Sequence, residues 1–252
     1  MINARNLPVP LDLDRAALFL DFDGTLIEFA ETPMGVVVNQ QTRQLLASLT
    51  AATEGACAII TGRELASLDT LLTPLELPAS GIHGLERRDV TGKRCDPGID
   101  TSDELELARE HIRDIAQLDQ RVLVEDKRVS LTVHFRRCPE LGAEIAAAMS
   151  VLSEELSTAW QVEPGQLMYE VRSTAHNKGT AIAAFMQENP FRGRQPVYFG
   201  DDKTDEDGFR TVNAMDGITV KVGEHESEAG FRLPDVDAVN ACLQAALEEL
   251  NH

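Results

Sequence analysis

The stretch "FLDFDGTLIE", from Phe19 to Glu28, joins an apolar run to two carboxylates. The apolar start is typical of a buried β-strand, yet Asp21 and Asp23 follow at once, with Gly24 and Thr25 directly behind them. Carboxylates at the end of a dry strand are unfavourable unless they have partners there. The stretch therefore predicts a strand that leads into a polar site.

Three further runs share the apolar, β-branched character of this strand. Together the four runs span residues 16–23, 55–62, 196–202 and 217–223. Each is apolar on both faces, as a parallel strand between two layers of helices must be. Segments with helical spacing alternate with them, at 40–52, 64–72, after Lys178 and at 236–250. This alternation predicts an α/β fold with a Rossmann-like core, in which a parallel sheet has helices on both faces.

The middle of the chain has a different pattern. A helical segment, an alternating hairpin, a second helix and a strand follow one another, at about 101–118, 121–137, 140–156 and 166–173. We therefore expect an inserted α+β domain at residues 88–173. The core domain would then be discontinuous and consist of residues 1–87 and 174–252.

The net charge argues against two classes of partner. The 252 residues are 43% hydrophobic, as in an ordinary globular protein, but 42 Asp and Glu outnumber 23 Lys and Arg, which gives a formal charge of −19. Such a surface repels phosphate backbones and anionic lipids, so we expect neither nucleic acid nor membrane as a partner. A site for an anionic substrate must supply its own positive charge.

Neither the N-terminal segment nor the cysteines indicate export. "MINARNLPVPLDLDRAA" lacks the basic and apolar regions of a signal peptide, and no apolar run approaches the roughly 18 residues of a membrane span. The four cysteines lie far apart and form no CxxC pair, which is typical of reduced thiols. We expect a cytoplasmic monomer that acts on a small molecule.

Polar residues follow several of the predicted strands. Because parallel strands present their carboxyl ends at one edge of the sheet, we expect these polar residues to gather at that edge. Three familiar sites do not fit them. Counted from Asp21, the positions that an EF-hand reserves for Gly and Glu hold Leu26 and Thr32. No GxxxxGK[ST] occurs, and no GxGxxG follows the first strand, so the sequence does not indicate a P-loop or a dinucleotide-binding site.

Phosphoryl transfer suits these residues better. Asp21 could attack a phosphorus atom in line and form an aspartyl-phosphate. Each pair of like unit charges about 4 Å apart costs about 4 kcal/mol at a dielectric of about 20, so positive charge is required. Mg²⁺ held by Asp21 and Asp201 would supply it, together with Lys178. The Thr61 hydroxyl would donate to the transferring group, and Asp23 would move protons.

Four motifs resemble those of the haloacid dehalogenase superfamily, in the same order. They are Asp21-Phe22-Asp23-Gly24-Thr25-Leu26, Thr61-Gly62-Arg63, Lys178-Gly179 and Gly200-Asp201-Asp202-Lys203-Thr204-Asp205-Glu206. The resemblance implies a nucleophilic Asp21, an acid/base Asp23 that also binds Mg²⁺ through its backbone carbonyl, and a metal ligand at Asp201. It leaves open whether Asp202 and Asp205 touch the metal; we count Asp202 among the expected ligands.

Four longer stretches resemble the trehalose-6-phosphate phosphatases. They are "GIHGLERR" (81–88), "VEDKRVSLTVHFR" (124–136), "YEVRSTAHNKG" (169–179) and "GDDKTDE" (200–206). The resemblance implies that the inserted domain is a cap that contacts the distal glucose through Glu125, Lys127 and Glu170. Acids accept hydrogen bonds from sugar hydroxyls and an ammonium donates them, although a surface ion pair would also explain Glu125 and Lys127. We expect Gly62 and Arg63 to contact the substrate as well.

The expected function is therefore Mg²⁺-dependent hydrolysis of trehalose 6-phosphate, the last step of trehalose biosynthesis in this family. Two alternatives stay open: the same chemistry on a sucrose phosphate or phosphoglycerate-sugar, and a non-catalytic sugar-phosphate sensor. A substrate with a second anionic group should recruit more Arg or Lys to the cap. The roles of His83, His134 and Arg136 stay open too.

Overall fold

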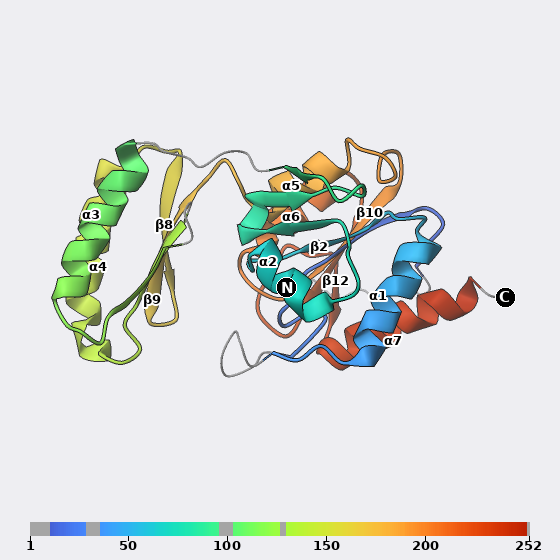
Figure 1. Ribbon diagram of the computed structural model, residues 1–252, viewed down its shortest axis with the longest axis horizontal. Helices are drawn as coiled ribbons and strands as arrows, with labels where there is room; N and C mark the ends of the chain where they lie inside the picture. The colour runs from blue at the N-terminus through green and yellow to red at the C-terminus, as the bar shows by residue number, and fades with distance from the viewer. Residues whose placement is uncertain (1–10, 29–35, 96–102, 127–129, 251–252) are drawn as a thin grey trace. The chain divides into compact units, whose positions relative to one another are not determined.

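The computed structural model describes residues 11–28, 36–95, 103–126 and 130–250 and divides the chain into two compact units, whose elements Figure 1 labels. Unit 1 comprises Met1–Asp96 and His176–His252, and unit 2 comprises Pro97–Ala175. The insertion expected from residue 88 thus differs at its start, because β4 (Glu86–Arg88) and β5 (Arg94–Cys95) extend the sheet of unit 1. Strands this short show no periodicity from which to predict them.

Among the described residues, the sheet of unit 1 has eight strands in the order β12-β11-β10-β1-β2-β3-β4-β5. Six of them are parallel, namely β1 (Ala16–Leu20), β2 (Cys57–Ile60), β3 (Ala79–Gly81), β10 (Gln195–Gly200), β11 (Ile218–Val222) and β12 (Phe231–Leu233). β4 and β5 are antiparallel to their neighbours. The four strands expected from the apolar runs are all present, so the predicted parallel sheet is confirmed.

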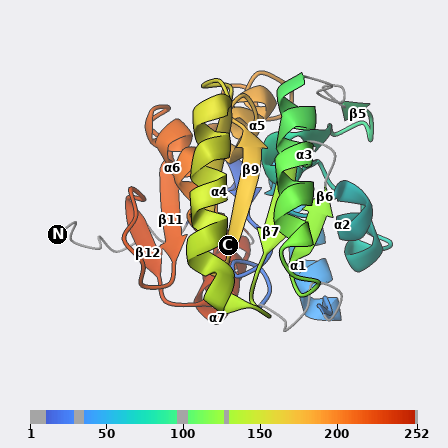
Figure 2. The ribbon, with the colours of Figure 1, turned by 90° about the vertical axis from the view of Figure 1, so that its left-hand side faces the viewer.

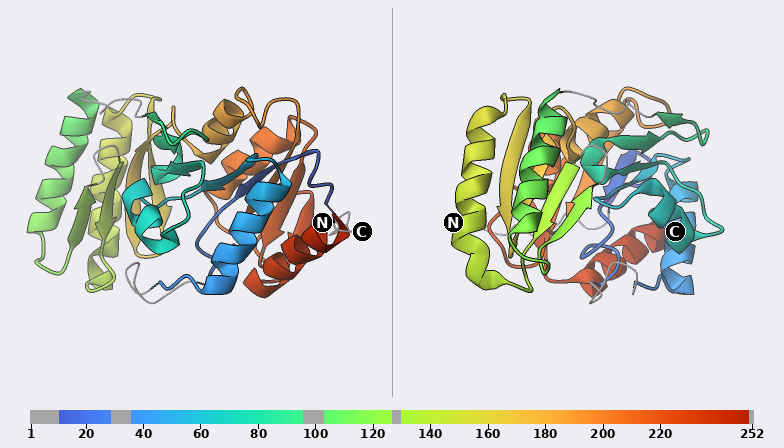
Figure 3. Two further views of the ribbon diagram at one scale, coloured as in Figure 1. Left: turned by 45° about the vertical axis from the view of Figure 1, so that its right-hand side comes forward. Right: turned by 60° about the vertical axis from the view of Figure 1, so that its left-hand side comes forward.

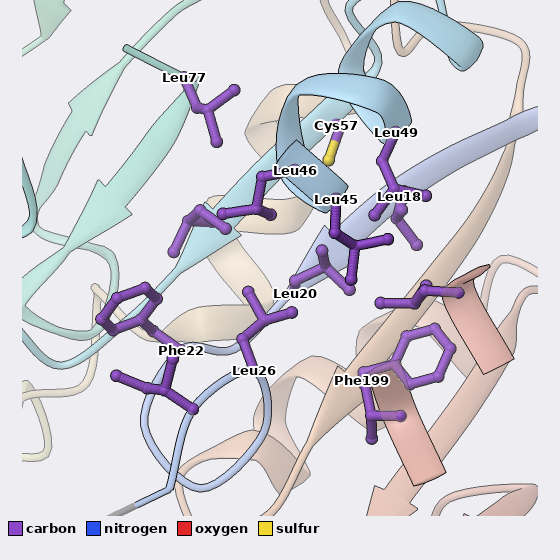
Figure 4. Packing of buried hydrophobic residues seen from close by; sticks show 14 of the residues in the cluster. Leu18, Leu20, Phe22, Leu26, Leu45, Leu46, Leu49, Cys57, Leu77 and Phe199 are labelled. Atoms are coloured by element: carbon purple, nitrogen blue, oxygen red, sulfur yellow. The ribbon is translucent and has the colours of Figure 1, made fainter. Parts of the chain in front are cut away.

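Helices cover both faces of this sheet. α1 (Gln40–Ala52), α2 (Leu65–Leu72) and α7 (Val236–Glu249) share one apolar cluster, whereas α5 (Lys178–Phe185) and α6 (Asp205–Asn213) belong to the cluster on the other face. Figure 3 (left) shows α1 and α7 side by side, and Figure 4 shows leucines of α1 packed towards β1 and Phe199 of β10. The predicted doubly covered α/β core is confirmed.

Unit 2 is a four-stranded antiparallel sheet with two helices. The strand order is β6-β7-β9-β8, with β6 (Leu123–Asp126), β7 (Ser130–His134), β8 (Trp160–Gly165) and β9 (Met168–Ser173). α3 (Asp103–Gln117) and α4 (Gly142–Glu155), which follows the short 3₁₀ helix η3 (Pro139–Leu141), lie side by side in Figure 2. They pack on the face that carries Leu131, Val133 and Val171. The alternation of the sequence thus leads to an α+β unit, as predicted.

Candidate active site

The candidate site begins where the two central strands of unit 1 end. β1 and β10 are parallel neighbours with Leu20 opposite Phe199, so Asp21 and Asp201 emerge from adjacent strands at one edge. The N–H of Asp21 still donates to the carbonyl of Phe199, at 2.9 Å. One carboxylate oxygen each from Asp21, Asp201 and Asp205 lies within 4.8 Å of the others. Parallel pairing therefore gathers carboxylates that are about 180 positions apart in the sequence.

Lys178 is the cation at the centre of this group. It is the first residue of α5, which begins with a capping box between Asn177 and Thr180. The Lys178 ammonium donates to Oδ1 of Asp21 at 2.8 Å and to Oδ1 of Asp205 at 2.6 Å, and the lysine is only 2% exposed. The cap thus fixes the helix start from which the lysine reaches the carboxylates.

Asp205 lies deepest in the group, with no exposed surface, and accepts four hydrogen bonds. Oδ1 accepts from the Lys178 ammonium and the Tyr198 hydroxyl, and Oδ2 accepts from the backbone N–H groups of Asp201 and Asp202, both at 2.9 Å. Gly200 is required beside it, because a Cβ there would come within 2.4 Å of Asp205 Cγ. Asp205 therefore organises the loop that carries Asp201.

Asp202, which is expected to bind the metal, has its Oδ1 3.8 Å from the Lys178 ammonium and also orders the loop before α6; its role as a metal ligand stays a prediction. Its Oδ1 accepts from the N–H and hydroxyl of Thr204, at 2.8 and 2.7 Å, and from the N–H of Asp205 at 3.2 Å, so it holds the turn that leads into α6. Its carboxylate is not part of the close group. Asp201 remains in that group and accepts a hydrogen bond from the Thr25 hydroxyl at 3.2 Å.

The charges of the group explain its pKa values. Burial raises the pKa of Asp21 to about 7; the Lys178 ammonium opposes this, and the charges of Asp202 and Asp201 add to it. Burial also raises the pKa of Asp201 to about 6, with repulsion from Asp205 and Asp202. Burial acts to lower the pKa of Lys178, but the charges of Asp205 and Asp21 outweigh it and raise that pKa well above its ordinary value. One ammonium thus faces several carboxylates.

This donor set fits a hard divalent cation. The convergent groups are all carboxylate oxygens, the ligands that Mg²⁺ takes in proteins, usually one or two carboxylates with water. Because Asp205 is already engaged by four donors, Asp21 and Asp201 are the carboxylates best placed to hold the ion. A divalent cation, added to the ammonium of Lys178, would also relieve the excess of negative charge, which together with burial raises the pKa values of Asp21 and Asp201.

Asp23 and the loop after β2 meet beside this group. The Arg63 guanidinium forms a fork on the Asp23 carboxylate, with Nε to Oδ2 at 2.5 Å and Nη2 to Oδ1 at 2.6 Å. Thr61 is buried, and its Oγ accepts from the N–H of Arg63 at 3.1 Å, so its hydroxyl proton can still be donated elsewhere. Gly62 lies between them and is half-buried. The expected substrate residue Arg63 thus contacts the expected proton-transfer residue.

Two expected sugar contacts share one face of the sheet in unit 2. Glu125 is opposite Thr132, which is opposite Glu170, so the three side chains lie in one row on the face away from α3 and α4. Glu125 is exposed and its Oε2 lies 3.4 Å from Nε2 of His134, while Glu170 is only 8% exposed. Lys127 lies outside the described residues, as does the side chain of His83, and Arg136 is exposed.

Sequence reasoning missed three residues that hold the site together. They are Thr25, which donates to Asp201, Tyr198, which donates to Asp205, and Lys221, which donates to backbone carbonyls of the same loop. Thr25 stands in the first of the four motifs and Lys221 is a charged residue within the otherwise apolar run 217–223, but the sequence assigns a role to neither, and Tyr198 leaves no signal. None of the described helices has the length and apolarity needed to cross a membrane.

Comparisons with known proteins show the family of this chain. A probable trehalose-phosphate phosphatase of Sinorhizobium fredii is 38% identical over 242 residues, which cover 95% of this chain and 90% of that one. The trehalose-6-phosphate phosphatase of Escherichia coli is 37% identical over 92% of this chain and 88% of its own. The C-terminal domain of Candida albicans trehalose-6-phosphate phosphatase has the same fold, with a TM-score of 0.81, 22% identity and coverage of 98% and 99% of the two chains. The sequence model of the trehalose-phosphatase family matches residues 19–237, and the chain belongs to this family.

Proposed function

We propose that this protein is a Mg²⁺-dependent phosphatase that hydrolyses trehalose 6-phosphate to trehalose and inorganic phosphate. The reaction class follows from the family, and the substrate is the one in the name of the Escherichia coli relative. The observation that carries the proposal is the buried group in which Asp21 meets Lys178 while an Asp201 oxygen lies within 4.8 Å. Action in the cytoplasm and as a monomer stays a prediction from the sequence.

In the first half-reaction, an oxygen of Asp21 attacks the phosphorus atom and forms an aspartyl-phosphate. The bond between phosphorus and the sugar oxygen breaks, and Asp23 gives that oxygen a proton. In the second half-reaction, Asp23 takes a proton from water as the water oxygen attacks phosphorus, which releases phosphate and restores Asp21. Lys178 and the Thr61 hydroxyl stabilise the negative charge on the transferring phosphoryl oxygens.

The proposed Mg²⁺ ligands are the carboxylates of Asp21 and Asp201 and the backbone carbonyl of Asp23. When bound, the ion would neutralise charge on the phosphate and on Asp21, which otherwise repel one another. Asp205 and Asp202 support this arrangement from within the protein, the first through Lys178 and two backbone N–H groups and the second by holding the turn that leads into α6.

The fork between Arg63 and Asp23 gives the arginine a second task in this scheme. Both oxygens of Asp23 accept from the guanidinium, and a proton on the carboxyl group removes the negative charge that holds this fork together, so the fork weakens when Asp23 carries the proton for the leaving oxygen. The N–H groups that this frees match phosphate geometry, as guanidinium forks do. Arg63 would thus pass from Asp23 to the substrate as the substrate binds.

The sugar would be selected by unit 2. The Glu125 and Glu170 carboxylates accept hydrogen bonds from hydroxyl groups, and they lie in one row with the Thr132 hydroxyl, which donates or accepts. Lys127 is the expected cationic partner in the same unit. A neutral disaccharide suits such a face, because it presents many hydroxyl groups and no second charge.

The test is phosphate release from a panel of esters, with Mg²⁺ and with EDTA. The proposal expects trehalose 6-phosphate to react far faster than glucose 6-phosphate or sucrose 6-phosphate, and EDTA to stop the reaction. Metal-dependent release that favours another sugar phosphate would keep the roles of Asp21 and Asp23 but refute those of Glu125 and Glu170. No release from any ester would refute the enzymatic proposal and favour a sensor.

A further inference from the structure

Lys221 is a buried cation that none of the roles above uses. It lies in β11 and is 2% exposed, whereas a lysine is almost never fully buried without partners. Its neighbours Val220 and Val222 face the apolar cluster of α1 and α7, so strand alternation turns Lys221 to the face of α5 and α6. A buried ammonium at this place calls for a physical reason.

The reason lies in the partners of the ammonium group. Lys221 Nζ donates to the backbone carbonyl of Asp201 and lies 3.4 Å from that of Asp202. Lys221 is in register with Gly200 across β10 and β11, so it sits beside the point where the loop of Asp201 leaves its strand. Lys221 in β11 thus reaches the backbone of the loop that follows the neighbouring strand β10.

The same two residues are held from the other side by Asp205. Its carboxylate accepts from the N–H groups of Asp201 and Asp202, while the Lys221 ammonium faces their carbonyl groups. The N–H groups of this short backbone segment, which carry partial positive charge, therefore face the buried carboxylate of Asp205. The carbonyl groups of the same segment, which carry partial negative charge, face the buried ammonium of Lys221. Peptide groups held in this way cannot turn without breaking charge-assisted hydrogen bonds, which fixes the direction in which the Cα–Cβ bond of Asp201 leaves the backbone.

We propose that Lys221 is a positioning residue which, together with Asp205, clamps the backbone of Asp201 and Asp202 so that the Asp201 carboxylate faces Asp21 in the geometry that binds the divalent cation. This inference rests on the proposed function. It also predicts in which direction the affinity for the divalent cation changes when Lys221 is replaced. Removing a nearby positive charge by itself would tighten cation binding, whereas removing a clamp loosens it.

The experiment is a Mg²⁺ titration of the melting temperature, without substrate, for the wild type and three variants. Lys221→Met removes the charge and the donors and keeps most of the packing; Lys221→Arg keeps both. Lys203→Met is the matched control, because Lys203 is exposed on the same loop. The half-saturating Mg²⁺ concentration should rise about tenfold or more in Lys221→Met, the size expected for partners that orient metal ligands, and stay within about threefold in the other two.

An unchanged or lower half-saturating concentration in Lys221→Met would overturn the inference. So would a lower melting temperature without Mg²⁺ combined with an unaltered titration, since that describes a merely structural lysine. If Lys221→Met does not fold, Lys221→Gln is compared with Lys221→Arg, and equal Mg²⁺ affinity of the two overturns it. A wild type without any Mg²⁺ response, in melting or in phosphate release, would refute the proposed function and this inference together; a responsive wild type with an insensitive Lys221→Met refutes the inference alone.

Discussion

The substitution Asp205→Asn removes one negative charge from the centre of the candidate site and keeps the shape of the side chain. Asp205 has no exposed surface, and all four of its hydrogen-bond partners are donors. An amide offers one accepting oxygen and one NH₂ group. Whichever way it turns, the NH₂ group faces two donors, either the backbone N–H pair or Lys178 with Tyr198.

The cost follows from these contacts. Leaving two buried donors without an acceptor costs about 1–3 kcal/mol each, and breaking a buried ion pair costs about 3–5 kcal/mol in all. Lys178 retains its hydrogen bond to Asp21 at 2.8 Å, which offsets part of this loss. We expect the free energy of unfolding to fall by about 3 kcal/mol.

The assay is urea unfolding followed by far-UV circular dichroism. Fluorescence of Trp160, the only tryptophan of the chain, reports unit 2 in the same samples. Asp207→Asn is the matched control, because it lies in the same helix turn but pairs with Arg210, whose side chain is 53% exposed. Such exposed pairs contribute about 0–1 kcal/mol. If Asp205→Asn costs no more than Asp207→Asn, the view of Asp205 as the anchor of the site is refuted.

Four further predictions concern catalysis, metal binding and stability. Asp21→Asn should reduce turnover at least about a thousandfold, because an amide is no nucleophile; near-normal phosphate release from a verified variant would exclude the role of Asp21. Glu125→Ala should raise the KM for trehalose 6-phosphate about tenfold or more but leave p-nitrophenyl phosphate almost unaffected, whereas equal losses on both would refute the sugar contact. The rise in melting temperature on adding Mg²⁺ should shrink between pH 8 and 5.5, because Asp21 and Asp201, with pKa values of about 7 and 6, bind protons there that compete with the ion. Without Mg²⁺ the sign reverses: the folded protein binds these protons at a higher pH than the unfolded chain does, so stability should rise as pH falls through this range, and a fall would contradict the raised pKa values.

Those parts of the protein that depend on local pattern could be predicted from the order of the amino acids. Apolar runs on both faces predicted the parallel strands, and the change to alternation predicted the α+β unit. The four longer stretches that resemble the trehalose-6-phosphate phosphatases predicted the family that the comparisons then showed. The sequence also identified Asp21, Asp201 and Lys178, which the structure brings together although Asp21 and Lys178 are 157 positions apart. Such predictions succeed because neighbouring parallel strands must present their ends at one edge.

The partners of the charged groups, in contrast, could be assigned only from the folded chain. Folding directed Asp202 to the start of α6, Arg63 to Asp23, and Lys221 to the carbonyl groups of the Asp201 loop. It also placed β4 and β5 in the sheet of unit 1. The partner of a side chain depends on distance in space and on burial, because burial makes an unpaired charge costly. Neither the distance nor the burial can be derived from the spacing of residues along the chain.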